Sequence, residues 1–174
     1  MRILGIDPGT IRMGYGVINS DGGDVAFEDC GVLQATKGDP IEKRLSHIYD
    51  QLRVLIERVS PEVVAIEEPF VVRAPRNSAL AVGEARAIAM LAATQRDLPI
   101  FQYTPTKVRQ TVAGYGAGGK EQTQQMVSLL LDTALDAFPF DASDALAVAI
   151  CHSRHPDLLG FIEQAEPTKA GRPG

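Results

Sequence analysis

Four carboxylates in this sequence are placed where they could act together on one bound ion or substrate. Asp7 ends a short apolar run directly before Pro8-Gly9, and Glu67 ends a second apolar run. Asp141 and Asp144 are three residues apart, so on a helix they share one face, with roughly 5–6 Å between their Cβ atoms. Carboxylates gathered this closely need a cation to remain ionised together, and oxygen ligands favour Mg²⁺ or Mn²⁺ over zinc. Two such ions ~3.5–4 Å apart are suited to hydrolysis of a phosphodiester.

Each of these carboxylates also has a simpler interpretation. Asp141 alone could cap the N-terminus of a helix, and Asp7 could merely open a turn. Glu68 competes with Glu67, but a comparison of the two apolar runs favours Glu67. In both runs four residues of buried type precede the acid, so Glu67 matches Asp7 and Glu68 would point to the opposite face.

The elements that must position the acids can be predicted from hydrophobic periodicity and turn residues. Three short strands joined by tight turns predict an antiparallel meander, and a helical crossover predicts that a fourth strand lies parallel to the first. We expect an α/β fold, with one domain over residues 1–157 and a disordered tail over 158–174. Strands are expected at 2–7, 14–19, 25–35, 62–67 and 99–103, and helices at 40–59, 78–96, 104–112, 120–131 and 142–151.

Composition and charge narrow the class of protein. The chain has 174 residues, of which 45% are hydrophobic, as expected of a globular domain with a real core. No apolar run approaches the ~20 residues that span a bilayer. Two cysteines are too few for a disulfide framework, which favours reduced thiols and a cytoplasmic location. The net charge is −5, yet residues 69–120 carry seven basic and two acidic side chains. That basic middle fits either a nucleic-acid partner or a solvated surface.

Candidate DNA contacts lie in this basic middle. Phe70 follows the acidic strand end, beside Arg73 and Arg76. It could stack on an unpaired base or be a core aromatic that ends the strand. The Gly-rich segment 114–119 has the spacing of a phosphate-binding loop, but an acid stands where Ser or Thr would hold Mg²⁺. We therefore interpret it as a loop that brings Lys120 to a phosphate.

The predicted helix over 78–96 is nearly apolar all round, which is typical of a helix covered on two sides. One cover would be the sheet. The other could be a second copy of the chain, with Ala81, Gly83 and Ala87 allowing close approach. We therefore expect a homodimer.

Several of these segments together resemble one family, the RuvC Holliday junction resolvases. The similarity runs in order from Met1 to about His152. It implies an RNase H-like five-stranded mixed sheet, a homodimer and Mg²⁺-dependent paired nicking of four-way DNA junctions, alongside the branch-migration proteins RuvA and RuvB. The segments are Ile6-Asp7-Pro8-Gly9, Gly14-Tyr15-Gly16, Ala65-Ile66-Glu67 with Phe70, Gln110-Thr111-Val112 with Gly114, Gly116 and Lys120, and Asp141-Ala142-Ser143-Asp144-Ala145-Leu146-Ala147.

The resemblance also implies roles for individual residues. The catalytic, metal-binding carboxylates would be Asp7, Glu67, Asp141 and Asp144, holding two Mg²⁺ ions for which Mn²⁺ can substitute. The aromatic wedge at the crossover would be Phe70, and the basic DNA contacts would be Lys107 or Arg109, and Lys120. Two other classes of protein fit the sequence less well. An actin-like ATPase needs two lobes around its nucleotide, which 174 residues do not allow. A binding module without catalysis does not need the complete set of acids.

Overall fold

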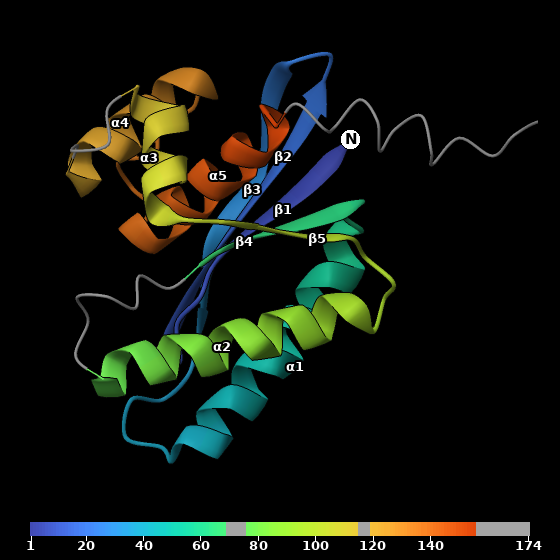
Figure 1. The fold of residues 1–174 in the computed structure, drawn as a ribbon, viewed down its shortest axis with the longest axis vertical. Helices are drawn as coiled ribbons and strands as arrows, with labels where there is room; N and C mark the ends of the chain where they lie inside the picture. The colour runs from blue at the N-terminus through green and yellow to red at the C-terminus, as the bar shows by residue number, and fades with distance from the viewer. Residues whose placement is uncertain (69–75, 115–118, 156–174) are drawn as a thin grey trace, which may run out of the picture.

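Five strands form one mixed sheet in this computed structural model, which describes residues 1–68, 76–114 and 119–155 (Figure 1). The strand order is β3-β2-β1-β4-β5. β1, β2 and β3 are antiparallel neighbours, whereas β4 and β5 run parallel to β1. The predicted meander with two parallel strands is therefore confirmed. The strands are β1 Arg2–Asp7, β2 Arg12–Asp21, β3 Asp24–Gln34, β4 Val63–Glu67 and β5 Ile100–Tyr103.

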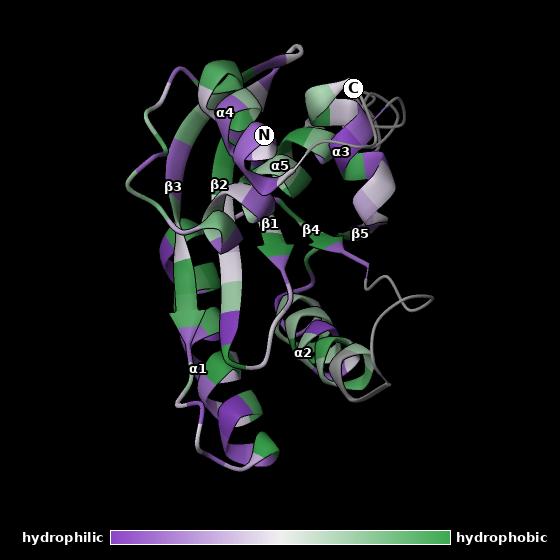
Figure 2. Cartoon of the chain, turned by 90° about the vertical axis from the view of Figure 1, so that its left-hand side faces the viewer, coloured by the Kyte–Doolittle hydropathy of each residue, from purple (hydrophilic) through white to green (hydrophobic). Residues whose placement is uncertain are grey.

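Helices cover both faces of this sheet (Figure 1). The helices are α1 Ile41–Val59, α2 Arg76–Thr94, α3 Pro105–Ala113, α4 Lys120–Leu130 and α5 Phe140–Ser153. Side chains of β1 alternate between the two layers: Ile3 packs in the cluster that contains α5, and Leu4 packs in the cluster that contains α1 and α2. The central strands β1 and β4 are largely hydrophobic (Figure 2), as expected of strands buried on both faces.

Helix α5 lies against the sheet with its backbone almost in contact with β1 and β2. A Cβ atom added at Gly5 would lie 2.1 Å from the carbonyl oxygen of Ala145, and one at Gly14 would lie 1.9 Å from that of Asp141. Gly5 pairs with Gly16 across the two strands, and a Cβ at Gly16 would lie 2.7 Å from Leu146. The glycines thus form a platform without side chains, and the platform fixes where α5 sits.

Some boundaries differ from the sequence prediction. α5 begins at Phe140 with Pro139 as its N-cap, so the simpler interpretation of Asp141 as a cap is wrong. α2 runs from Arg76 to Thr94 and not over 78–96. Its Ala85 and Ala89 are buried whereas Leu80 is 65% exposed, so one face of α2 is open in the single chain. The predicted tail lies outside the described residues.

Two further expectations from composition can be compared with the structure. Cys30 and Cys151 are both free and buried, as expected of reduced thiols. No helix within the described part of the chain is long and apolar enough to cross a membrane.

Candidate active site

Two carboxylates meet at the carboxyl ends of adjacent parallel strands. Asp7 is the last residue of β1 and Glu67 is the last residue of β4. Ile6 pairs with Ile66 in the register of these strands, so the acids that follow are next to each other at one edge of the sheet. This register confirms the alignment of the two apolar runs made from the sequence.

A third carboxylate joins them from helix α5. A pocket of about 170 Å³ is lined by Asp7, Glu67 and Asp144. Two cationic side chains line it as well, Arg109 from α3 and Lys120 from the start of α4. Asp141 is also among the described residues, but it does not line this pocket. The structure therefore brings three of the four predicted acids into one cavity.

Burial raises the pKa values of the three acids that line the pocket, and neighbouring carboxylates add to the effect. Burial raises the pKa of Asp7 well above its ordinary value, and the neighbouring Glu67 and Asp144 raise it further. Burial, followed by Asp144, raises the pKa of Glu67 to about 7, although Arg109 and Lys120 act in the opposite direction. Burial also raises the pKa of Asp144, although the neighbouring Lys120 lowers it in part. The pocket is lined by three carboxylates and two cationic side chains, so it carries one excess negative charge when all five groups are ionised.

Two ion pairs tie the α5 acids to cations of the chain. Lys120 Nζ lies 3.2 Å from Asp144 Oδ2, and Arg12 Nε lies 2.8 Å from Asp141 Oδ2. Lys120, which the sequence assigned to DNA, therefore also reaches into the acid cluster. The set fits a divalent cation by its chemistry, because it is made of oxygen ligands with excess negative charge. Its geometry is not that of a finished metal site, since no three His, Cys, Asp or Glu side chains among residues 1–68, 76–114 and 119–155 are grouped closely enough to hold an ion.

The remaining predicted residues fall in different places. Arg109 lines the acid pocket, whereas the side chain of Lys107 is exposed on α3. Phe70 and Arg73 lie outside the described residues, and so does the side chain of Arg76 at the start of α2.

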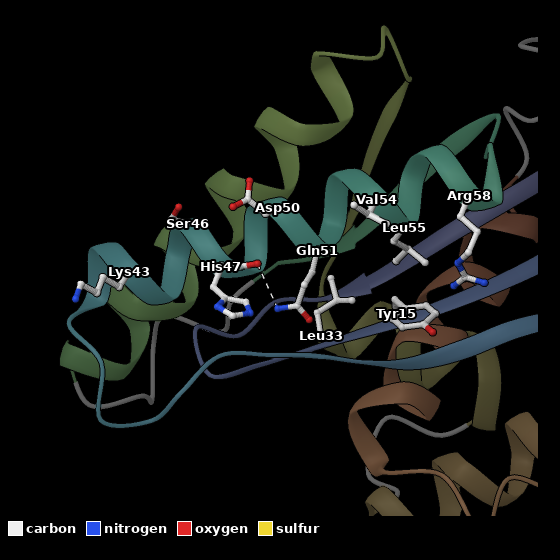
Figure 3. A pocket seen from close by; sticks show the side chains of 10 residues that line it. All are labelled: Tyr15, Leu33, Lys43, Ser46, His47, Asp50, Gln51, Val54, Leu55 and Arg58. Atoms are coloured by element: carbon white, nitrogen blue, oxygen red, sulfur yellow. Dashed lines mark hydrogen bonds between the residues drawn. The ribbon is translucent and has the colours of Figure 1, made fainter.

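Two features outside the pocket do not belong to the site. His152 is buried, its Nδ1 lies 2.6 Å from the hydroxyl of Tyr103, and its ring packs on Phe101, so it is part of the core. A larger hollow of about 580 Å³ lies between α1 and the strands β2 and β3 (Figure 3). Among the residues that the structure describes, Asp50 is the one acid that lines it, so these residues give the hollow no group of carboxylates for metal chemistry.

The raised pKa of Glu67 predicts a pH-dependent gain in stability when the charge is removed. A carboxyl group with a folded-state pKa of about 7 stabilises the fold while protonated, and this contribution is lost as the pH rises through 7. Metal-free Glu67→Gln should therefore be more stable than the parent by roughly 1–3 kcal/mol at about pH 8. This difference in unfolding free energy between the variant and the parent should become smaller toward about pH 5. Thermal unfolding in a chelator at both pH values measures it, with Glu68→Gln as the control; an equal gap at both would contradict the prediction.

The fold and the acids at its strand ends define an RNase H-like protein. Residues 3–152 match the family model of the crossover junction endodeoxyribonuclease RuvC. The chain belongs to the RuvC family.

Relatives and solved structures agree with this assignment. RuvC of Chloroflexus aggregans is 49% identical over 153 residues, covering 88% of this chain and 93% of the relative. RuvC of Dehalococcoides mccartyi is 45% identical over 170 residues, covering 97% of this chain and 100% of the relative. The structure of Thermus thermophilus RuvC in complex with a Holliday junction substrate superposes with a TM-score of 0.80 at 31% identity, covering 88% and 93%. The yeast mitochondrial Holliday junction resolvase has a TM-score of 0.61 at 18% identity, covering 87% and 78%, and so shares the fold.

Proposed function

We propose that this protein is a structure-selective endonuclease that resolves four-way DNA junctions in homologous recombination and DNA repair. It would cut two strands of like polarity by symmetric nicks. The observation that carries the proposal is the pocket in which Asp7, Glu67 and Asp144 converge from three separate elements. A chain of the RuvC family with this pocket has the groups that phosphodiester hydrolysis needs.

The carboxylates are proposed to hold two Mg²⁺ ions, for which Mn²⁺ can substitute. Asp7, Glu67 and Asp144 would hold them in the pocket, and Asp141 would contribute from the same helix. When bound, such ions supply an activated water and stabilise the leaving oxygen. Lys120 and Arg109 would neutralise part of the charge of the acids and of an incoming phosphate.

The DNA-binding surface is proposed to extend from this pocket over the basic middle of the chain. Lys107 is exposed on the same helix as Arg109, so it is placed to contact a phosphate next to the site. Phe70 lies three residues after Glu67, and we propose that it stacks at the crossover, with Arg73 and Arg76 contacting the DNA backbone. These contacts would distort and orient the junction rather than cut it.

The proposal is tested by incubating the protein with Mg²⁺ and a mobile four-way junction and mapping the nicks. The expected result is a pair of symmetric nicks across the junction, which disappears in a chelator. Linear duplex of the same sequence is the control and should stay uncut. Cutting of the duplex at the same rate would contradict structure selectivity.

A homodimer is the proposed working form, because two symmetric cuts need two active sites related by a twofold axis. Helix α2 supplies the surface through which the two copies are proposed to meet. Its alanines Ala85 and Ala89 are buried, while Leu80 and Leu91 are 65% and 47% exposed. Leu80, Ala87 and Leu91 are spaced so that they lie along one stripe of the helix, and this stripe is proposed as the dimer interface. RuvA and RuvB are the proposed partners of the dimer, in the cytoplasm.

Changing Ala87 to Glu should shift the protein toward the monomer, because it places a charge in the middle of the exposed apolar stripe. Sedimentation at micromolar concentration should give about twice 18.7 kDa for the parent and a lower mass for the variant. Val54→Glu is the matched control, since Val54 is an exposed apolar residue (66%) on the other helix, α1. A parent that sediments as a monomer even with junction DNA would contradict the dimer.

A further inference from the structure

The fourth acid of the proposed site is held by an arginine outside the acid pocket. Arg12 Nε lies 2.8 Å from Asp141 Oδ2, and the two side chains are 42% and 29% exposed. Asp144, one helical turn further along, lines the pocket with Asp7 and Glu67, and Asp141 does not. The two acids of α5 therefore differ in where their carboxylates are held.

The local structure explains how Arg12 reaches this acid. Arg12 and Gly14 are two residues apart on β2, so their side-chain positions point to the same face of the sheet. That face carries α5, because a Cβ at Gly14 would lie 1.9 Å from the carbonyl oxygen of Asp141. The close approach at Gly14 thus brings the first turn of α5 within reach of the arginine on the same strand.

An ion pair of this kind competes with a metal ion for the same oxygen. Asp141 is held by Arg12 and does not line the acid pocket, so a cation in the pocket that takes Asp141 as a ligand must draw its carboxylate away from Arg12 and weaken or break the pair.

We propose that Arg12 is a positioning residue: it keeps Asp141 apart from the other three carboxylates, so that a metal ion gains this fourth ligand only at the expense of the ion pair. This inference rests on the proposed function, because it assumes that the acids bind a divalent metal. It assigns Arg12 a role that opposes metal binding in the DNA-free protein. In the proposed role Arg12 contacts neither the scissile phosphate nor the attacking water; it acts through Asp141.

The test measures Mn²⁺ affinity without DNA, by electron paramagnetic resonance of the free ion during a titration. An exposed ion pair contributes about 0.2–1 kcal/mol, so Arg12→Gln should bind Mn²⁺ about 1.4- to 5-fold more tightly than the parent. Arg12→Lys keeps the charge and should return the affinity toward that of the parent. Arg58→Gln is the matched control and should leave it unchanged, because it breaks a similar pair with Asp29 (2.6 Å) beside the hollow of Figure 3.

A second pair of variants separates the proposed role from a general effect of charge. In the background of Asp141→Asn, Arg12→Gln should no longer tighten Mn²⁺ binding, because the ligand that it releases is gone. An equal gain in both backgrounds would overturn the proposal in favour of long-range repulsion. So would an unchanged or weaker affinity of Arg12→Gln in the parent background.

These outcomes are distinct from failure of the proposed function. If the parent binds Mn²⁺ and Arg12→Gln does not bind it more tightly, the positioning role fails and the metal site stands. If neither protein binds Mn²⁺, the metal site fails and the positioning role fails with it. Melting temperatures of the metal-free proteins should differ little, because the pair is exposed.

Discussion

Glu67→Gln and Asp144→Asn should each abolish nicking of a four-way junction while leaving its binding nearly unchanged. Both residues line the acid pocket, and each substitution removes a charge that is proposed to hold the metal ions. Loss of a group that only supports a ligand costs about 10- to 100-fold, so loss of the ligand itself should cost more than about 100-fold in rate. Junction binding should persist, because carboxylates repel phosphates and do not attract them.

Nicking and gel-shift assays on the same preparations measure the two effects side by side. Glu68→Gln is the matched control, because Glu68 is adjacent to Glu67 and is not among the residues that line the pocket. A variant at Glu67 or Asp144 that nicks at a rate within about tenfold of the parent, a barrier change of about 1.4 kcal/mol, would remove that residue from the site. A parallel loss of binding would instead indicate misfolding.

Gly5→Ala should cause a large loss of stability, because it adds a methyl group where β1 meets the backbone of α5. The new Cβ would lie 2.1 Å from the carbonyl oxygen of Ala145 and 2.8 Å from the amide nitrogen of Ala149. Both are backbone atoms of α5, so the helix itself must move. Overpacking of this kind costs roughly 1–3 kcal/mol, occasionally more. A loss of that size should lower the melting temperature by about 2–4 °C per kcal/mol.

The same substitution should also slow nicking, because α5 carries Asp144 into the pocket. Gly38→Ala is the matched control: a Cβ there meets no atom within 4 Å, so its stability should change by less than about 0.5 kcal/mol. Calorimetry and nicking rates of both variants give the comparison. A Gly5→Ala protein that melts and cuts like the parent would show that α5 does not depend on the glycine platform.

Much of the fold could be predicted from local patterns. Apolar runs that end in an acid locate β1 and β4, and the helix between them sets these strands parallel, so Asp7 and Glu67 fall together. The three-residue spacing of Asp141 and Asp144 placed both on one helix. These predictions hold because each depends on a period of the backbone, which a short stretch of sequence reveals.

Contacts between distant segments could not be predicted in this way. Nothing near Arg12 in the sequence indicates that its partner is Asp141, 129 residues away. The glycines of β2, Gly14 and Gly16, could be recognised as part of a family motif. Their physical role becomes visible only when α5 is seen against them. Lys120 was assigned to a phosphate because its loop is Gly-rich, and the structure adds a partner, Asp144, on another helix.

The position of α5 has a consequence for the protein during its synthesis. The helix that carries Asp141 and Asp144 follows all five strands in the chain, yet it packs on the first two. A nascent chain that ends before residue 140 therefore exposes the glycine platform and has only two of the four acids. Because contacts between distant segments also form slowly, the chain should acquire its capacity to cut DNA last, after the sheet is in place. A ribosome-bound fragment would then carry no active nuclease beside the cell's own chromosome.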